Sequence, residues 1–325
     1  MDNISAQFVD FAAAAAATDA MGNGFVHVHA LEPEILDLTK KRGVMLQRIK
    51  TRKATGHPTR YLEVSAAQAT AAFQDPRALA TAYGGPTRIE KAAFVKAITN
   101  GINFGHFDME VNNQQGIFTS LDSEDLDDMV GNVLRLQDAK LWTGSDTALA
   151  NPTTNEYVGL LTQITQTATI ASGTTITQAI RAEVARLDAD TGHKVRPSII
   201  VMNPLTQNIM EEEEIAADNT RKFYEVEVVA GVKVLGIMTC MGILPIIADP
   251  FLPVNTVETN KVHKIAILTE DLLTRYYVGS DIPRVFQMGT EESLVKKYMA
   301  LQYDCIVAKG ASYAHTILTK NVAVA

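Results

Sequence analysis

The most regular pattern of apolar and polar positions lies between Leu121 and Leu161. Acidic residues fill the first turns of a predicted helix, where the helix dipole favours negative charge, and we expect Asp122 to be its N-cap. A turn with Gly144 and Asn151-Pro152 follows, and an apolar segment then returns to the core. The pattern predicts a long amphipathic helix without a reactive group. Its buried stripe, with helical spacing, is Leu126, Met129, Val130, Val133, Leu134 and Leu141.

From Thr162 onward the pattern predicts a mixed α/β core. Thr175 is expected to cap a helix that ends at Asp190, and Asn203-Pro204 should open a second helix to about Glu213. Short runs rich in Val and Ile predict strands between these helices and after them. The expected strands cover residues 198–202, 224–229, 232–235, 244–248, 263–268, 284–288 and 294–303.

The first 108 residues carry a weaker pattern. Residues 1–44 resemble an arm, with an Ala-rich stretch and a short helix from Glu32 or Pro33 to Lys41. Extended segments are expected at 45–53, 60–64 and 88–104. About 60 residues with few large apolar side chains cannot form a core of their own. Because a two-stranded excursion is marginal in water, we expect a projecting loop that a neighbouring copy covers.

Charge is distributed in blocks along the chain. Residues 1–39 contain no Lys or Arg, residues 40–60 contain no acid, and residues 108–128 are acidic again. Two explanations remain open: the blocks are solvated faces, or acidic and basic patches of different subunits meet. In the second case the subunit-interface residues are Arg48, Lys50, Arg52, Lys53, Arg60, Asp122, Glu124 and Asp125.

Composition narrows the class of protein. The 325 residues are enough for two subdomains. With 29 basic and 37 acidic residues the net charge is −8, which disfavours a sequence reader of nucleic acids. Cys240 and Cys305 make no disulfide framework, no apolar run is long enough to span a membrane, and the N-terminus has no basic region of a signal peptide. We expect synthesis in the cytosol and no membrane partner.

Catalytic and metal-binding patterns are weak. The sequence contains no phosphate-binding, nucleophile-elbow or zinc-protease motif. His27 and His29 share a strand face without a third ligand, and the acidic run 211–214 fits a solvated helix end better than a calcium site. Asp304 beside Cys305 has no histidine nearby in the sequence. We therefore expect no enzyme, no cofactor and no metal site.

Five segments, in order, resemble the major capsid proteins of tailed bacteriophages, which have the Hong Kong 97-type fold. The end of the long helix is similar to the spine helix of that family, and the following segments are similar to its axial-domain entry, its strand-to-helix step, its central strand pair and its closing strands. The segments are Leu141-Trp142-Thr143-Gly144-Ser145, Tyr157-Val158-Gly159-Leu160-Leu161, Ile200-Val201-Met202-Asn203-Pro204-Leu205-Thr206, Val234-Leu235-Gly236 with Leu244-Pro245-Ile246-Ile247, and residues 294–315.

The resemblance implies an α+β capsid fold in four parts. These are an N-terminal arm (1–44), an extended loop (45–108), a peripheral domain with the spine helix (109–160 and 281–305) and an axial domain (161–280 and 306–325). It also implies self-assembly into pentamers and hexamers of an icosahedral head around double-stranded DNA, in a virion assembled in the bacterial cytoplasm. The implied partners are portal and scaffolding proteins and, in some members, a decoration protein.

Two departures from the family pattern matter. No loop lysine matches the motif of the intersubunit isopeptide bond, so cross-linking is not predicted. The chain begins directly in arm-like sequence, which favours a separate scaffolding protein. Two alternatives stay open: an encapsulin-type compartment that encloses protein cargo and, as a third class, an α/β hydrolase or transferase.

Overall fold

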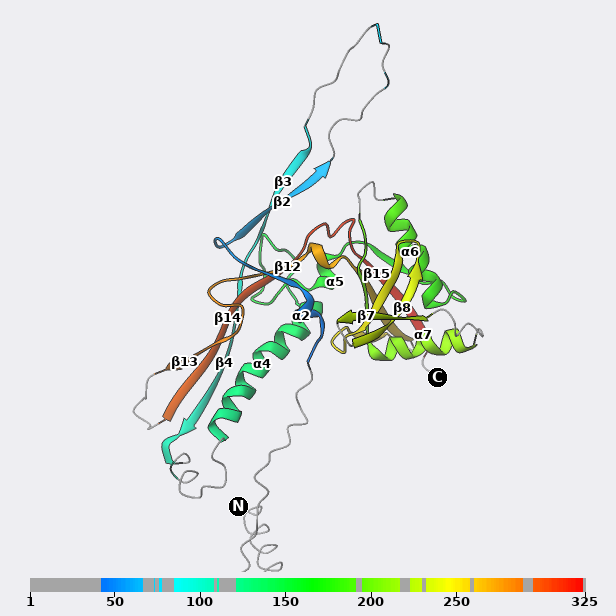
Figure 1. Ribbon diagram of the computed structural model, residues 1–325. Helices are drawn as coiled ribbons and strands as arrows, with labels where there is room; N and C mark the ends of the chain where they lie inside the picture. The colour runs from blue at the N-terminus through cyan, green and yellow to red at the C-terminus, as the bar shows by residue number, and fades with distance from the viewer. Residues whose placement is uncertain are drawn as a thin grey trace, which may run out of the picture.

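The computed structural model describes residues 42–66, 73, 76–77, 85–107, 110, 121–190, 195–216, 223–229, 232–257, 260–288 and 295–323. These residues form two bodies and one projecting ribbon (Figure 1). One body is a five-stranded sheet with the long helix along it. The other is an eight-stranded sheet with two further helices.

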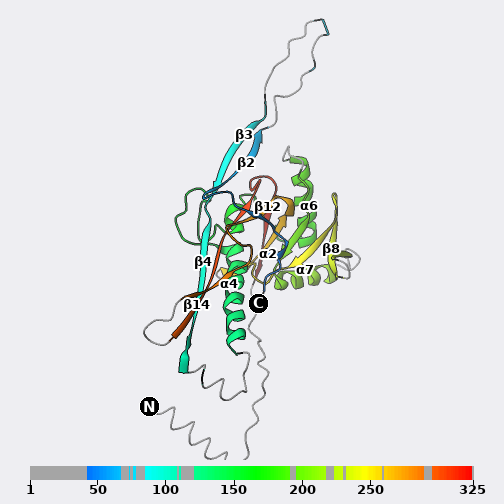
Figure 2. The same cartoon turned by 60° about the vertical axis from the view of Figure 1, so that its left-hand side comes forward.

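The five-stranded sheet has the order β1-β12-β14-β13, and β4 pairs with the other side of β14. Its strands are β1 (Lys50–Lys53), β4 (Lys96–Gly105), β12 (Leu273–Tyr277), β13 (Arg284–Met288) and β14 (Val295–Ala308). The long helix α4 (Leu121–Thr143) runs alongside β4 and β14 (Figures 1 and 2). Met129 and Val133 of the helix pack with Ala300 of β14 in a small core.

Helix α4 follows the predicted stripe, with Met129, Val133 and Leu141 at most 2% exposed. Its start differs from the prediction. The helix begins at Leu121, so Asp122 lies in the first turn and is not the N-cap, although an acid there still suits the helix dipole.

The eight-stranded sheet has the order β5-β15-β11-β6-β9-β8-β7, with β10 paired to β11. Both faces of its centre are covered, because alternate residues of β6 belong to two different cores. Ile200 and Met202 pack with α6 (Ile176–Asp190) and α7 (Pro204–Ala216), whereas Ile199 and Val201 pack with the end of α4. The strands are β5 (Thr167–Thr169), β6 (Ile199–Met202), β7 (Phe223–Val229), β8 (Val232–Thr239), β9 (Gly242–Ala248), β10 (Val254–Val257), β11 (Asn260–Leu268) and β15 (Thr316–Ala323).

Both predicted helix caps are confirmed. The Thr175 hydroxyl accepts the backbone N–H of Gln178 at 3.3 Å, and the Asn203 side-chain oxygen accepts that of Leu205 at 3.0 Å. Each polar side chain satisfies an N–H that the first helical turn leaves without a partner. The helices therefore start where the sequence predicts, and α7 continues to Ala216, three residues beyond the predicted end.

The segment 45–108 differs most from the expectation of one projecting loop. Met45–Arg48 is a short helix, α2, and Met45 and Leu46 are buried in the core of their own chain. Strands β1 and β4, at the two ends of the segment, belong to the five-stranded sheet. Only β2 (Thr59–Ala66) and β3 (Thr87–Ala93) form a separate two-stranded ribbon, which projects from the body (Figures 1 and 2). Residues 94 and 95 divide the single strand expected at 88–104.

Strand β12 is a second difference. It lies within the range 161–280 that the family resemblance assigned to an axial domain, yet it pairs antiparallel to β14 and parallel to β1. Strand β14 itself continues to Ala308, past the expected end at Tyr303. Pairing between distant strands, which leaves no local signature in the sequence, decides both outcomes.

Candidate subunit interface and the junction behind it

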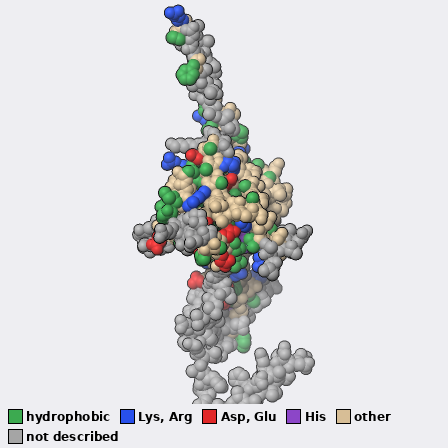
Figure 3. Space-filling model, turned by 90° about the vertical axis from the view of Figure 1, so that its right-hand side faces the viewer, with side chains coloured by type: hydrophobic (Ala, Val, Ile, Leu, Met, Phe, Trp, Pro, Cys, Tyr) green, Lys and Arg blue, Asp and Glu red, His purple; other side chains and the backbone are tan. Residues whose placement is uncertain are grey.

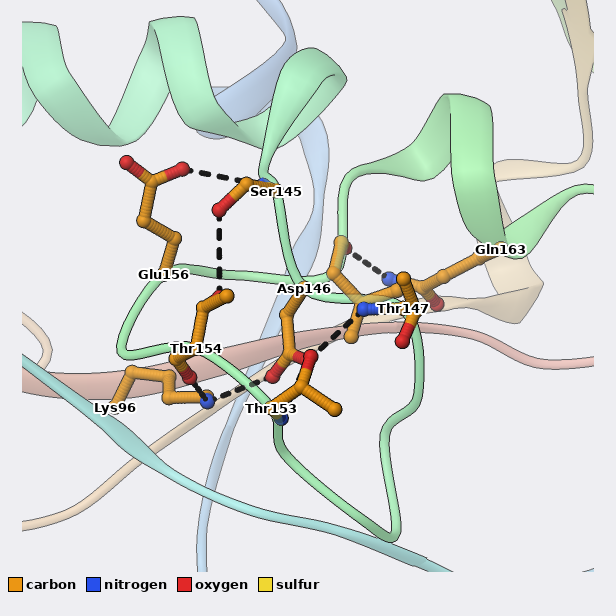
Figure 4. A network of polar contacts seen from close by, with 9 residues as sticks. Lys96, Ser145, Asp146, Thr147, Thr153, Thr154, Glu156 and Gln163 are labelled. Atoms are coloured by element: carbon orange, nitrogen blue, oxygen red, sulfur yellow. Dashed lines mark hydrogen bonds and ion pairs between the residues drawn. The ribbon is translucent and has the colours of Figure 1, made fainter.

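The loop between α4 and α5 (Leu160–Gln163) joins the two bodies, and Asp146 is its centre (Figure 4). The Asp146 carboxylate accepts the backbone N–H groups of Thr147 and Thr153 at 2.9 Å and the Thr153 hydroxyl at 3.0 Å. It also pairs with Lys96 of β4 at 2.8 Å. Burial alone would raise the pKa of Asp146, but the hydrogen bonds from Lys96, Thr153 and Thr147 hold it well below its usual value. The loop is thus tied to the sheet by a charged carboxylate.

Two glycines bring the ends of this loop into contact. A Cβ on Gly144 would lie 2.3 Å from the Tyr157 carbonyl oxygen, and one on Gly159 would lie 2.4 Å from the Trp142 carbonyl oxygen. Beside them Glu156 binds Lys140 at 2.8 Å and the Ser145 N–H at 3.1 Å. The hydrogen bond from Lys140 is the main reason why the pKa of Glu156 is lowered. The exit of α4 and the entry to α5 are therefore held at backbone contact.

Asp304 and Cys305 belong to a buried structural network. Arg275 pairs with Asp304 at 2.9 Å, Gln137 of α4 donates to it at 2.9 Å, and the Tyr157 hydroxyl donates to it as well. Burial raises the pKa of Cys305 to about 12, with a smaller contribution from Asp304, so this thiol stays protonated and is a poor nucleophile. The network ties the long helix to the sheet.

The predicted basic interface residues lie on α2, β1 and the ribbon. Arg48 pairs with Glu270 at 2.6 Å, Lys50 with Asp271, and Arg60 with Glu90 across the ribbon at 3.1 Å. All three thus have partners within their own chain, which the sequence did not indicate. Arg52 and Lys53 of β1 are exposed and form no ion pair with any described residue.

The predicted acidic patch is only partly described. Asp125 of α4 is half-buried, and the structure does not describe the side chains of Asp122 and Glu124. Three of the basic residues, Arg48, Lys50 and Arg60, pair instead with Glu270, Asp271 and Glu90 of their own chain. Contact between the two patches stays a prediction about different copies.

Exposed apolar side chains were missed by the sequence reasoning. On the ribbon Leu62 is 68% and Val64 46% exposed, and they share one face because both point away from the buried Tyr61. The alternation of apolar residues around Tyr61 indicates a strand, but it does not indicate which face of that strand stays exposed to solvent. The edge strand β13 exposes a second set, Val285, Phe286 and Met288. Figure 3 shows hydrophobic side chains on the projecting part of the chain, and interspersed acidic and basic side chains on the body.

The ribbon is anchored firmly at its root. Glu63 pairs with Lys91 at 2.6 Å and accepts the Gly310 N–H at 3.1 Å. The Lys309 ammonium lies 5.7 Å from the ring centroid of Tyr61 and 5.6 Å from that of Tyr276, within range of a cation–π interaction. The exposed face of the ribbon is therefore presented in a defined direction.

The remaining candidates are two histidines and an acidic run. His27 and His29 lie outside the described residues, and within the described part no three metal-ligating side chains cluster. The solvated face expected at 211–214 is wrong in part: Glu214 is 1% exposed, and Glu213 accepts the Ile176 N–H at 2.7 Å and pairs with Lys320 at 2.9 Å. No helix in the described ranges has both the length and the apolar character of a membrane span.

No protein-family model matches the sequence, and no curated protein matches it. Solved structures do match over nearly the whole chain. The capsid of a native GTA particle gives a TM-score of 0.65 at 12% identity, with 93% of this chain and 97% of that chain covered. An encapsulin complex from Synechococcus elongatus gives 0.63 at 13% identity, with 93% and 94% covered. The head of the Helicobacter pylori bacteriophage KHP40 gives 0.60 at 11% identity, with 93% and 96% covered.

These neighbours define the class of the fold, because each match covers 93% of this chain at a TM-score of 0.60 or more. The fold is that of shell-forming capsid proteins, and most of the similar structures are phage capsids. The chain has the Hong Kong 97-type capsid fold, as the five sequence segments predicted.

Proposed function

We propose that this chain is the major capsid protein of a tailed bacteriophage and has no enzymatic activity. Copies of it assemble into the pentamers and hexamers of an icosahedral head that encloses double-stranded DNA. The observation that carries this proposal is the ribbon: on a capsid fold, β2 and β3 project from the body with Leu62 and Val64 exposed. An isolated two-stranded ribbon is marginal in water and becomes stable when another surface covers it. Neighbouring copies supply that surface in a shell.

The four-part division of the chain is part of this proposal. The arm is residues 1–44, the loop is centred on the β2–β3 ribbon, the five-stranded sheet with α4 is the peripheral domain, and the eight-stranded sheet is the axial domain. The Asp146 loop and the two glycines support it, since they hold the exit of α4 and the entry to α5 in backbone contact. A rigid junction and a projecting ribbon together let one chain occupy five-fold and six-fold rings.

Basic and acidic patches guide the register of neighbouring copies in this scheme. Arg52 and Lys53 are the better candidates for the basic side, because Arg48 and Lys50 already bind Glu270 and Asp271. The acidic side is the start of α4, with Asp122, Glu124 and Asp125. Exposed pairs contribute little affinity but suppress wrong registers through like-charge repulsion.

A charge reversal tests the register proposal. We expect Arg52→Glu with Lys53→Glu to prevent particle formation while the subunit stays folded. The matched control, Arg196→Glu with Lys261→Glu, changes the net charge equally at two exposed positions of the eight-stranded-sheet body. Normal particles from the β1 variant, or equal losses in both, would refute the register role.

Portal and scaffolding proteins, packaged DNA and, in some heads, a decoration protein are the proposed partners, and the virion is the proposed location. Electron microscopy of the chain expressed with its genomic neighbours tests the function as a whole. Closed particles that contain DNA support it. Closed particles filled with one protein cargo would identify an encapsulin-type compartment instead, and a chain that forms no particles under any of these conditions would refute both.

A further inference from the structure

Phe73 is the most exposed large apolar side chain in the described part of the chain, with a relative exposure of 109%. It lies in the connection between β2 and β3, so the ribbon carries it. Leu62 and Val64 on the same ribbon keep part of their surface covered, whereas no described residue covers the Phe73 ring. An exposed aromatic ring on a projecting element is typical of an anchor for another surface.

A cleft of matching size opens on the five-stranded-sheet body. It lies between α4, β4 and the end of the Asp146 loop and has a volume of about 250 Å³. Ile98, Leu136 and Tyr157 form its apolar walls, and Leu136 is 44% exposed, an unusual position for a leucine on this helix. An apolar cavity of about 150 Å³ already binds benzene, so a phenyl ring fits here.

The rim of this cleft is charged. Lys140 and Glu156 face each other at 2.8 Å and are 33% and 39% exposed, so solvent or a partner can reach them. The wider hollow at the root of the ribbon, about 610 Å³ near Tyr61 and Leu149, is too large for one ring to fill.

We propose that Phe73 of one copy inserts its ring into the α4–β4 cleft of a neighbouring copy, against Leu136 and Ile98. This inference rests on the proposed shell function and adds to it a specific anchor and its receptor. Two apolar surfaces that a single chain leaves in water, the Phe73 ring and Leu136, then cover each other.

A cysteine pair tests the contact directly. We expect Phe73→Cys with Leu136→Cys, in a Cys240→Ser background, to form disulfides between chains in assembled particles. On a non-reducing gel these appear as a ladder of chain multiples that reductant removes. Cys305 stays buried and does not interfere. The matched control pairs Phe73→Cys with Leu205→Cys, because Leu205 is 60% exposed on α7, away from the cleft.

Particles without a ladder, or equal ladders from both pairs, would overturn the anchor and leave the shell function intact. If the cysteine chain does not assemble in reductant, the particle yields of Phe73→Leu and Phe73→Ser are compared instead. The anchor predicts at least tenfold more particles from the leucine variant than from the serine variant. Equal yields would overturn it. Failure of the unaltered chain to form any particle would instead remove the proposed function itself.

Discussion

Because of the buried His315, the fold should lose stability at mildly acidic pH. The side chain is fully buried in the segment between β14 and β15, and both ring nitrogens have backbone partners. Nδ1 accepts the Thr269 N–H at 3.2 Å, and Nε2 donates its hydrogen to the Lys309 carbonyl at 3.1 Å. These partners require the neutral ring, because a proton on Nδ1 would face the Thr269 N–H.

The magnitude follows from the pKa of His315. Burial lowers it from 6.5 to about 4, against a smaller opposing effect of the Lys309 carbonyl. The His315 ring therefore binds a proton below about pH 6.5 in the unfolded chain, but only below about pH 4 in the folded chain. The stability that neutral His315 contributes is fully present above pH 6.5 and is lost as the pH falls from 6.5 to 4. One group with these pKa values costs about 2 kcal/mol at pH 5 and about 3 kcal/mol once the pH is below 4.

Urea unfolding of the full-length chain at pH 7.5 and pH 5 measures this loss. Trp142 is the only tryptophan and is buried at the junction, where it donates to Asp249 at 3.1 Å, so its fluorescence reports on the relevant region. The control is His315→Asn, whose side-chain oxygen can still accept the Thr269 N–H but does not titrate. We expect the asparagine variant to lose about 2 kcal/mol less than the natural chain between the two pH values. Equal losses would refute the reasoning.

Three further predictions concern the junction and the thiols. Gly159→Ala should lower the unfolding free energy by at least about 2 kcal/mol, since its Cβ would lie 2.4 Å from a backbone oxygen; Gly85→Ala, with open space around it, should change thermal unfolding little. Asp146→Asn should cost about 3 kcal/mol by leaving the Lys96 ammonium, 11% exposed, without a charged partner, whereas Asp271→Asn, whose side chain is 79% exposed, should cost less than about 1 kcal/mol in the same urea titration. A thiol reagent at neutral pH should modify Cys240 in the native chain and Cys305 only after denaturation; rapid modification of both would contradict the buried, protonated state of Cys305.

Local features were predictable because they depend on residues a few positions apart. The apolar stripe of α4 and the strands β6, β7, β8, β9 and β11 follow from spacing, and the Thr175 and Asn203 caps follow from side chains that satisfy nearby N–H groups. Strands β5, β10 and β15 were not predicted. The same kind of reasoning failed at Met45–Arg48, where the expected strand is a helical turn whose buried residues pack against distant elements.

The candidate interface was predictable only in part. Charge blocks identified Arg52 and Lys53 as exposed basic residues, and they lie on an edge strand. The partners of Arg48 and Lys50, by contrast, are more than two hundred positions away at Glu270 and Asp271, a separation across which one sequence carries no pairing signal. Neither the exposed Phe73 nor the cleft at Leu136 has a signature in composition or periodicity, because exposure and hollow space are properties of the assembled surface.

The amino-acid order settles the three long helices, the Thr175 and Asn203 caps, most strands and, through five short segments, the capsid fold. The tertiary structure alone decides that β1 joins β12 with Lys50 opposite Thr274, that β4 pairs with β14, and that only β2 and β3 remain as a ribbon. The physical reason is the range of the forces involved. Helix periodicity and capping act within a few residues, whereas strand pairing and burial depend on which distant segments meet once the chain has folded.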